Sequence, residues 1–219
     1  MGYFITFEGI EGCGKTTQIK LLGEQLESLG YSVLITREPG GCPIADKIRS
    51  ILLDADNRGM SSLTELLMYA AARAQHVSEV ILPALKQGNV VLCDRFTDAT
   101  IAYQSYGRGI DQETVNKLNL MACQSVFPDL TVLIDCEVTT GLERARRRIE
   151  TNSGPREERF ELEALDFHQR VRNGYLTIAQ NEPQRFITVD GSGSREAISE
   201  IIAAQVLQNR LNNNIYATL

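Results

Sequence analysis

The feature that most constrains this chain is a glycine-rich segment near its start, placed between a strand pattern and a helix pattern. Residues 9–16 read GIEGCGKT and satisfy the pattern G-x-x-x-x-G-K-[ST]. The apolar run 3–8 precedes this segment, and apolar residues at helical spacing follow it over 19–29. Such a loop holds phosphate oxygens with backbone N–H groups and with the positive end of the following helix. The chain is therefore expected to begin with a phosphate-binding β-α-β unit.

Two side chains of this loop have expected roles of their own. Lys15 is expected at a solvent-facing position from which it reaches the β- and γ-phosphates, and the Thr16 hydroxyl is expected to ligate Mg²⁺. The alternative is a glycine-rich turn that binds nothing, but such a turn needs neither lysine nor threonine. The residues expected to bind ATP are Gly9, Ile10, Glu11, Gly12, Cys13, Gly14, Lys15, Thr16 and Thr17.

The rest of the chain alternates short apolar runs with helical patterns. The β-rich runs are Tyr3–Glu8, Ser32–Thr36, Val90–Cys93, Thr131–Asp135 and Arg185–Val189. Gly30 is expected to end the first helix. Ser62 and Thr140, each followed three residues later by glutamate, are expected to open helices as capping boxes, and Asp111 is expected to cap a third helix. Apolar strands that alternate with helices predict an α/β fold whose parallel sheet is covered on both faces.

Composition narrows the class of protein. A net charge of −6 argues against a surface built to bind a nucleic-acid polymer, although a mononucleotide needs only a local basic pocket. Five scattered cysteines and two histidines favour neither a disulfide framework nor a zinc site. No apolar run approaches the length of a membrane span. We expect one domain over residues 1–219, in the cytoplasm, without a membrane partner.

An acidic and a basic residue follow the apolar run 90–93. Asp94 and Arg95 are expected at the carboxyl end of a strand, the edge where ligands of open parallel sheets bind. Asp94 is expected to hold Mg²⁺ through water and Arg95 to bind a phosphate. The alternative is a structural ion pair. Asn116-Lys117 is not followed by x-Asp, so the guanine-reading motif of nucleotide switches is not formed there.

One stretch breaks the alternation of strands and helices. Residues 149–159 are polar, contain Gly154-Pro155 and follow the basic run 144–148. We expect a lid at about 147–160, followed by a helix from about Glu161 to Ala179.

Four segments together resemble the thymidylate kinase family. They are FEGIEGCGKTT (7–17), TREPGG (36–41), LMYAAARAQH (67–76) and DRFTDATIAYQ (94–104), and the similarity runs from about Tyr3 to Leu207. The resemblance implies a three-layer P-loop nucleoside monophosphate kinase fold with a five-stranded parallel sheet in the order 2-3-1-4-5. It also implies a homodimer that moves the γ-phosphoryl of Mg·ATP onto dTMP, a step of dTTP synthesis, and a cis Glu38-Pro39 bond.

The resemblance also implies roles for substrate-binding residues. Tyr69 stacks on thymine, Arg73 contacts the base edge, and Thr100 and Gln104 complete base recognition. Arg95, with Arg37 and Arg49, holds the dTMP phosphate. Tyr103 fills the space of a ribose 2′-hydroxyl, and Glu11 accepts from the 3′-hydroxyl. The alternatives without a role in substrate binding are that Tyr69 belongs to the core face of its helix and that Arg49 is a solvated helix residue.

The source of a transition-state arginine is the last expectation. Gly12 supplies no charge where some family members carry a basic residue, so the chain resembles the group with arginine in the lid. Arg159 is the first candidate and Arg147 the second, beside Lys15 and Arg95, and the alternative is that the lid arginines only pair with nearby glutamates. Two other functions stay open: another small P-loop (deoxy)nucleoside or nucleoside monophosphate kinase, and a nucleotide-dependent switch without catalytic activity.

Overall fold

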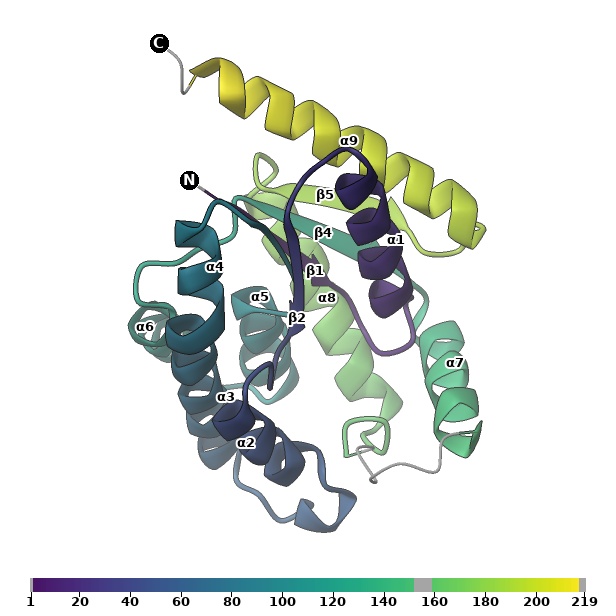
Figure 1. Cartoon of the computed structure of the whole chain (residues 1–219). Helices are drawn as coiled ribbons and strands as arrows, with labels where there is room; N and C mark the ends of the chain where they lie inside the picture. Colours follow the sequence, from purple (N-terminus) through teal and green to yellow (C-terminus); the bar gives the residue numbers. More distant parts are fainter. Residues whose placement is uncertain (1, 152–158, 217–219) are drawn as a thin grey trace.

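The computed structural model describes residues 2–151 and 159–216 and contains one parallel sheet. Its strands are β1 (Tyr3–Glu8), β2 (Val33–Arg37), β3 (Val90–Asp94), β4 (Leu130–Asp135) and β5 (Phe186–Asp190). The strand order is β2-β3-β1-β4-β5 and every pairing is parallel (Figure 1). The expected α/β fold and its 2-3-1-4-5 order are confirmed. Each strand end either matches the expected residue or differs from it by one residue.

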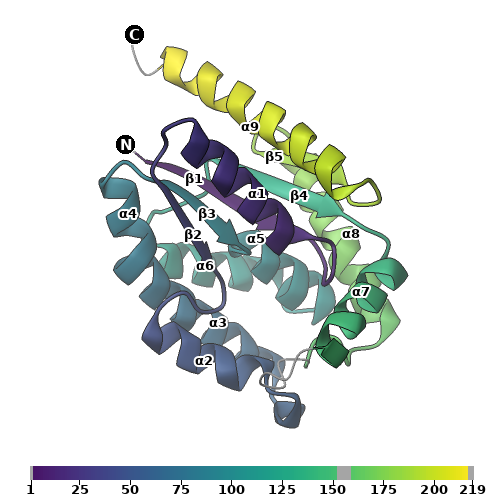
Figure 2. The same ribbon diagram turned by 45° about the vertical axis from the view of Figure 1, so that its right-hand side comes forward.

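Helices cover both faces of this sheet (Figure 2). Helices α1 and α9 lie on one face, whereas α4, α5, α6 and α8 lie toward the other. The α-helices are α1 (Lys15–Ser28), α2 (Pro43–Leu53), α3 (Ser62–His76), α4 (Leu82–Lys86), α5 (Thr97–Thr100), α6 (Gln112–Cys123), α7 (Val138–Thr151), α8 (Leu165–Asn181) and α9 (Arg195–Tyr216). The shorter segments are the 3₁₀ turn η1 (Ala55–Asn57) and the π-helical segments η2 (Val77–Ile81) and η3 (Ile101–Gly107).

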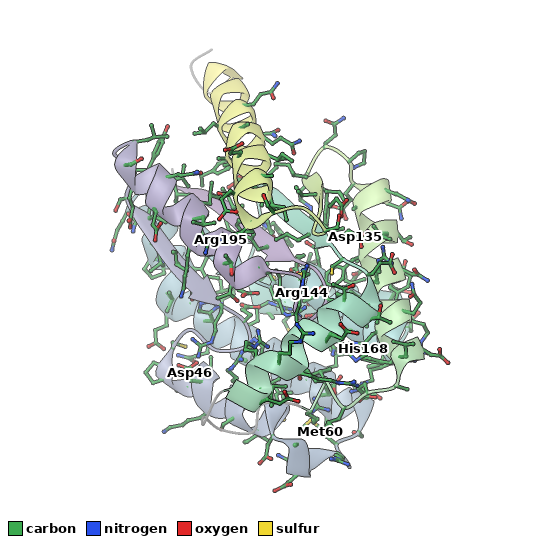
Figure 3. The ribbon with its side chains drawn as sticks, turned by 90° about the vertical axis from the view of Figure 1, so that its right-hand side faces the viewer. Asp46, Met60, Asp135, Arg144, His168 and Arg195 are labelled. Carbon is green, nitrogen blue, oxygen red and sulfur yellow. The ribbon has the colours of Figure 1, made fainter. Side chains whose placement is uncertain are left out.

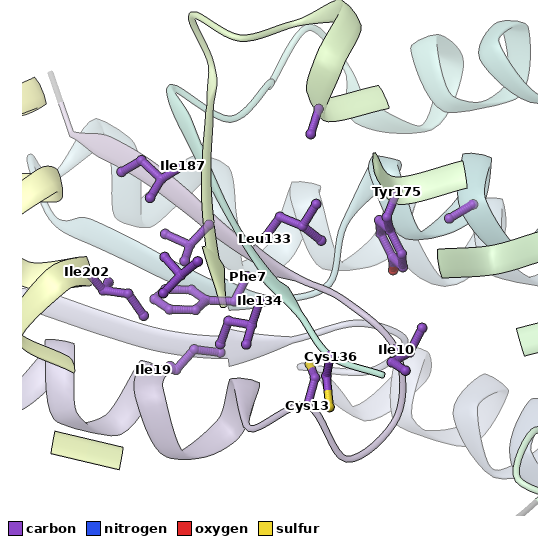
Figure 4. Close-up of a cluster of buried hydrophobic side chains, with 14 of the residues drawn as sticks. Phe7, Ile10, Cys13, Ile19, Leu133, Ile134, Cys136, Tyr175, Ile187 and Ile202 are labelled. Carbon is purple, nitrogen blue, oxygen red and sulfur yellow. The ribbon is translucent and has the colours of Figure 1, made fainter. Parts of the chain in front are cut away.

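The core follows from the alternation of side chains along the strands. Ile5 and Phe7 of β1 enter the larger apolar cluster, which includes Ile19 of α1 and Ile202 of α9 (Figure 4). Phe4, which faces the other way, joins a second cluster built with η2, α4 and α6. Because both faces are packed, the sheet edge at the carboxyl ends of the strands is left to carry polar chemistry.

Helix ends test the expected caps. Gly30 follows the end of α1 with φ +86°, and Asp111 Oδ2 accepts from the Thr114 N–H, so both expectations are confirmed. The capping box at Ser62 is wrong by one residue, because the Ser61 hydroxyl is the group that accepts from the Thr64 N–H. The box at Thr140 is wrong, because α7 has already begun at Val138.

The helix after the lid begins later than expected. It starts at Leu165 and not at about Glu161, because the Arg159 N–H donates to Leu53 O and the Glu163 N–H to Phe160 O, which holds the chain in turns. Residues 152–158 of the expected lid lie outside the described residues. In the two described ranges, no helix is long and apolar enough to cross a membrane.

A close backbone contact joins α7 to the glycine-rich loop. A Cβ added at Gly141 would lie 2.5 Å from Glu11 O, and one added at Gly12, where φ is +68°, would lie 2.0 Å from Gly141 O. Neither position leaves space for a side chain. The loop and α7 therefore fix each other's position.

This contact predicts the sign of a glycine substitution. In a helix, Gly→Ala usually stabilises by about 1 kcal/mol. Gly141→Ala should instead destabilise by about 1–2 kcal/mol and weaken ATP binding, because its methyl group meets backbone and overpacking costs about 1–3 kcal/mol. Urea unfolding and ATP titration calorimetry check both effects. Gly23→Ala in α1 is the matched control, since its methyl group meets side chains and no backbone, the nearest atom being the flexible Cδ1 of Ile35 at 2.8 Å. A gain of stability for Gly141→Ala would contradict the proposed contact.

Candidate active site

The carboxyl edge of the sheet opens into a cavity of about 950 Å³. The glycine-rich loop forms one end of it, and α2, α3 and η3 supply its other walls. All nine residues expected to bind substrate line it: Glu11, Arg37, Arg49, Tyr69, Arg73, Arg95, Thr100, Tyr103 and Gln104. Gly12, Lys15, Thr16 and Asp94 line it as well.

The glycine-rich loop has the backbone that its glycines allow. Gly9, Gly12 and Gly14 have φ of +134°, +68° and +104°, in the region where residues with a Cβ are strained. Helix α1 begins directly afterwards, at Lys15. The first N–H groups of α1 therefore face the cavity end where a phosphate would bind.

Lys15 is not solvent-facing, contrary to the expectation. The side chain is buried, and Nζ donates to Gly9 O at 3.0 Å and to Ile10 O at 2.8 Å. These carbonyls hold the ammonium group inside the loop, because a buried cation needs acceptors.

The two expected metal ligands lie together. The Thr16 hydroxyl donates to Asp94 Oδ2 at 3.0 Å, across the start of α1 and the end of β3. In the described ranges, no group of three or more His, Cys, Asp and Glu side chains is placed to hold a metal ion.

Arg95 is held in an unusual backbone conformation. Its φ is +69°, a left-handed value that costs a non-glycine residue about 1–2 kcal/mol. Its NH1 donates to Tyr175 Oη at 2.9 Å and its NH2 to Glu11 Oε1 at 3.2 Å. The guanidinium also lies 4.8 Å from the ring centroid of Tyr103. The strand end, the loop and α8 thus orient this arginine into the cavity.

Glu11 gathers groups from three elements. Its Oε1 accepts from Tyr103 and Arg95, and Oε2 lies 3.3 Å from Nδ1 of His168. The His168 side chain, labelled in Figure 3, is fully buried. Burial alone would raise the pKa of Glu11, but His168 and then Arg95 lower it well below its usual range. Glu11 is therefore a carboxylate at neutral pH. Sequence reasoning missed His168, because its position on α8 gives no signal that links it to the loop.

Three predicted arginines have acidic or backbone partners. Arg73 is buried and donates to Glu38 Oε2, Asn119 Oδ1 and Phe96 O. Arg37 donates to Asp46 at 3.1 Å and is exposed. Arg49 NH1 donates to Pro39 O, and the Glu38-Pro39 bond is cis, as expected. The Thr100 Oγ1 atom is buried and has no partner among the described residues.

The two lid arginines lie apart from the cavity. Arg159 is buried, with Nε bound to Leu52 O and NH1 2.7 Å from Glu65 Oε2. Arg147 is exposed on α7 and does not line the cavity. Arg148 and Phe160 do line it, and neither was among the expected site residues. Phe160 packs edge-on against Tyr103, with 5.4 Å between ring centroids.

The arrangement defines a class of protein. A phosphate-binding loop faces one end of a cavity whose other walls carry several arginines, and this geometry is that of a P-loop phosphotransferase with a small phosphorylated acceptor.

Comparison with known proteins specifies the family. The family model for thymidylate kinase matches residues 7–202. The thymidylate kinase of Pelobacter propionicus is 78% identical over 219 residues, all of both chains, and that of Geobacter sulfurreducens is 59% identical over 211 residues, 96% and 99% of the two chains. The crystal structure of thymidylate kinase from Ehrlichia chaffeensis matches with a TM-score of 0.72 at 36% identity, covering 94% of this chain and 97% of that one. The chain belongs to the thymidylate kinase family, and the expectation that it phosphorylates dTMP is confirmed.

Proposed function

We propose that this chain transfers the γ-phosphoryl group of Mg·ATP to the phosphate of dTMP, with both substrates in the cavity at the sheet edge. The observation that carries the proposal is the bond between Glu11 and Arg95, which ties the ATP-binding loop directly to the acceptor side. The ATP phosphates bind to the N–H groups of residues 9–17, and the dTMP phosphate binds to Arg95 with Arg37 and Arg49.

Thr16, through its hydroxyl, and Asp94, through water, are the residues that would hold Mg²⁺. Their oxygens lie 3.0 Å apart, on the side of the cavity where the ATP phosphates bind. Two protein oxygens fit this ion, because Mg²⁺ usually keeps several waters and completes its shell with substrate phosphates. The ion neutralises charge on the transferring group when it is bound.

The protein's own residues act mainly by position and charge. Lys15 exchanges its two carbonyl partners for oxygens of the β- and γ-phosphates. A hydrogen bond from an ammonium group to a charged phosphate oxygen is stronger than one to a neutral carbonyl. Arg95, preoriented by Glu11 and Tyr175, holds the attacking dTMP phosphate in line. No general base is needed, since a phosphate oxygen is already ionised.

Recognition of the deoxynucleoside falls to α3 and η3. Tyr69 stacks on thymine, Arg73 meets its edge with the N–H groups that remain, and Thr100 and Gln104 complete the contacts. Tyr103, whose hydroxyl donates to Glu11, occupies the space of a 2′-hydroxyl. Glu11 accepts from the sugar 3′-hydroxyl.

The remaining expectations are retained as part of this proposal. The chain acts as a single domain over residues 1–219 with a lid at about 147–160. All five cysteines are buried free thiols, which suits the reducing cytoplasm. The chain falls in the family group with arginine in the lid, since Gly12 carries no charge and a Cβ there has no space.

Substrate preference tests the function. With saturating ATP, dTMP should be the best acceptor, dUMP should lose roughly 10- to 200-fold in kcat/KM, and UMP should be poorer still. One methyl group in a fitted pocket is worth only about 1–3 kcal/mol, so dUMP keeps measurable activity. Coupled ADP release across a panel of nucleoside monophosphates measures this order. Equal rates with dAMP or dGMP would exclude the proposed acceptor, and slow phosphate release alone would favour a switch.

Three substitutions locate the transition-state arginine. Arg159→Ala and Arg147→Ala are expected to lose kcat with little change in dTMP affinity, as for a contact made mainly in the transition state. Arg148 now joins them, because it lines the cavity. Single-turnover rates at saturating substrates, with melting temperatures, separate the three. An added arginine is worth about 10³–10⁵ in phosphoryl transfer. If all three variants keep kcat within a few-fold, the lid supplies no such arginine.

We further propose that the chain forms a homodimer through α3 and α6. These helices pack against each other, and large apolar side chains are exposed on both. They are Leu63 and Leu67 on α3, Leu120 and Met121 on α6, and Phe127 just after α6. One patch of this kind can pair with its own copy about a two-fold axis.

A single charge tests this surface. Met121 is 77% exposed, so Met121→Glu should leave the fold of each protomer intact, as a cooperative melting curve shows. The sedimentation coefficient should shift from that of a dimer to that of a monomer. Ile201→Glu on α9 is the matched control, an exposed apolar residue outside the surface, and should remain a dimer. A wild-type chain that sediments as a monomer at micromolar concentration would refute the dimer.

A further inference from the structure

A buried carboxylate behind the cavity has no role in the proposed function. Glu65 lies on α3 and is fully buried. Its Oε1 accepts from Gln104 Nε2 at 2.9 Å and from Arg108 Nε at 3.1 Å. Its Oε2 accepts from Arg108 NH2 at 3.1 Å and lies 2.7 Å from Arg159 NH1. Each oxygen thus has two donors.

This arrangement fixes what Glu65 can do. An ionised carboxyl group only accepts hydrogen bonds, at about four positions, and here all four are used. Burial alone would raise the pKa of Glu65, but the hydrogen bonds and charge of Arg108, followed by Gln104 and Arg159, lower it. The group is therefore ionised at neutral pH and cannot turn into a donor.

Glu65 in turn fixes the amide of Gln104. Only the NH₂ end of that amide can face a carboxylate, because the reverse orientation would place two acceptors against each other. Gln104 is 1% exposed and lines the cavity. Because Nε2 is the end that faces Glu65, Oε1 is the other end of the amide, so an acceptor is what this side chain presents to a ligand. Thr100, one turn earlier, adds an unpaired hydroxyl.

An acceptor at this position discriminates between pyrimidines. Thymine and uracil carry a donor at N3, whereas cytosine has a bare acceptor there. We propose that Glu65 is a specificity-determining positioning residue: by locking the Gln104 amide with Oε1 toward the base, it admits N3–H pyrimidines and rejects cytosine. The proposal rests on the role of Gln104 in base recognition given above.

Glu65→Gln tests the lock. Glutamine can either donate or accept, so the Gln104 amide is released to turn its NH₂ group toward cytosine N3. The ratio of kcat/KM for dTMP over dCMP, each measured alone, should fall about tenfold or more, the value of one buried hydrogen-bond mismatch. Arg108→Gln is the matched control, because it removes another donor to Glu65 and leaves the lock in place. Its ratio should be unchanged.

Glu65→Gln removes a buried carboxylate that pairs with Arg108 and Arg159. The uncompensated buried positive charge should lower the stability of the folded protein. The double variant Glu65→Gln/Arg108→Gln removes one negative and one positive charge together, so the net charge of this buried cluster is unchanged. Melting curves show which variant is folded, and the double variant should show the same loss of discrimination as the single one.

Gln104→Leu distinguishes the two ways in which the inference can fail. If Gln104→Leu lowers the ratio but both Glu65 variants keep it within twofold, Gln104 reads the base and Glu65 does not orient it, so the inference is wrong. If Gln104→Leu leaves the ratio unchanged, Gln104 does not read the base, and the inference fails together with that part of the proposed function.

Discussion

The bond between Arg95 and Glu11 is the interaction on which the site depends. Glu11 belongs to the loop that precedes α1, and Arg95 follows β3, so the bond joins the two halves of the cavity across neighbouring strands. The left-handed backbone of Arg95 is tolerated because its N–H donates to Phe7 O and its guanidinium is held by Glu11 and Tyr175. Strain of about 1–2 kcal/mol is thus offset by charge-assisted hydrogen bonds. Tyr175 in turn donates to the buried Glu8, which accepts from the Phe96 N–H, so the network reaches into the core.

Acidic residues position three of the arginines that line this cavity. Glu38 holds Arg73, Asp46 holds Arg37, and Glu11 holds Arg95. A phosphate-binding pocket built of arginines alone would repel itself in the absence of substrate. Carboxylates that bind from behind remove that repulsion and leave the remaining N–H groups directed at the ligand. This helps explain how a chain with a net charge of −6 can carry a basic pocket.

Much of this architecture could be read from local sequence. The order of strands and the place of Tyr69 followed from the family resemblance. Lys15 and Asp94 were placed at the loop and at the end of β3 by the sequence patterns around them, although the Lys15 side chain is buried and does not face solvent. Other features could not be predicted, because they depend on contacts between distant segments. Thr140 has the sequence of a cap, yet α7 begins two residues earlier. Arg159 sits in a basic, polar segment, yet Leu52 O and Glu65 hold it behind the cavity wall. His168 reaches Glu11 only because α8 packs over η3.

The contact between Gly12 and Gly141 places one end of α7 against the phosphate-binding loop, so a rotation of the helix about this contact would move its other end. From Gly141 to Arg148 the helix spans about 10 Å, at 1.5 Å per residue. A tilt of about 10° about this contact would therefore move Arg148 by about 2 Å. A shift of that size decides whether a side chain is within hydrogen-bond distance of a phosphate oxygen. A small rearrangement of the loop around ATP would in this way be amplified at Arg148, which lines the cavity.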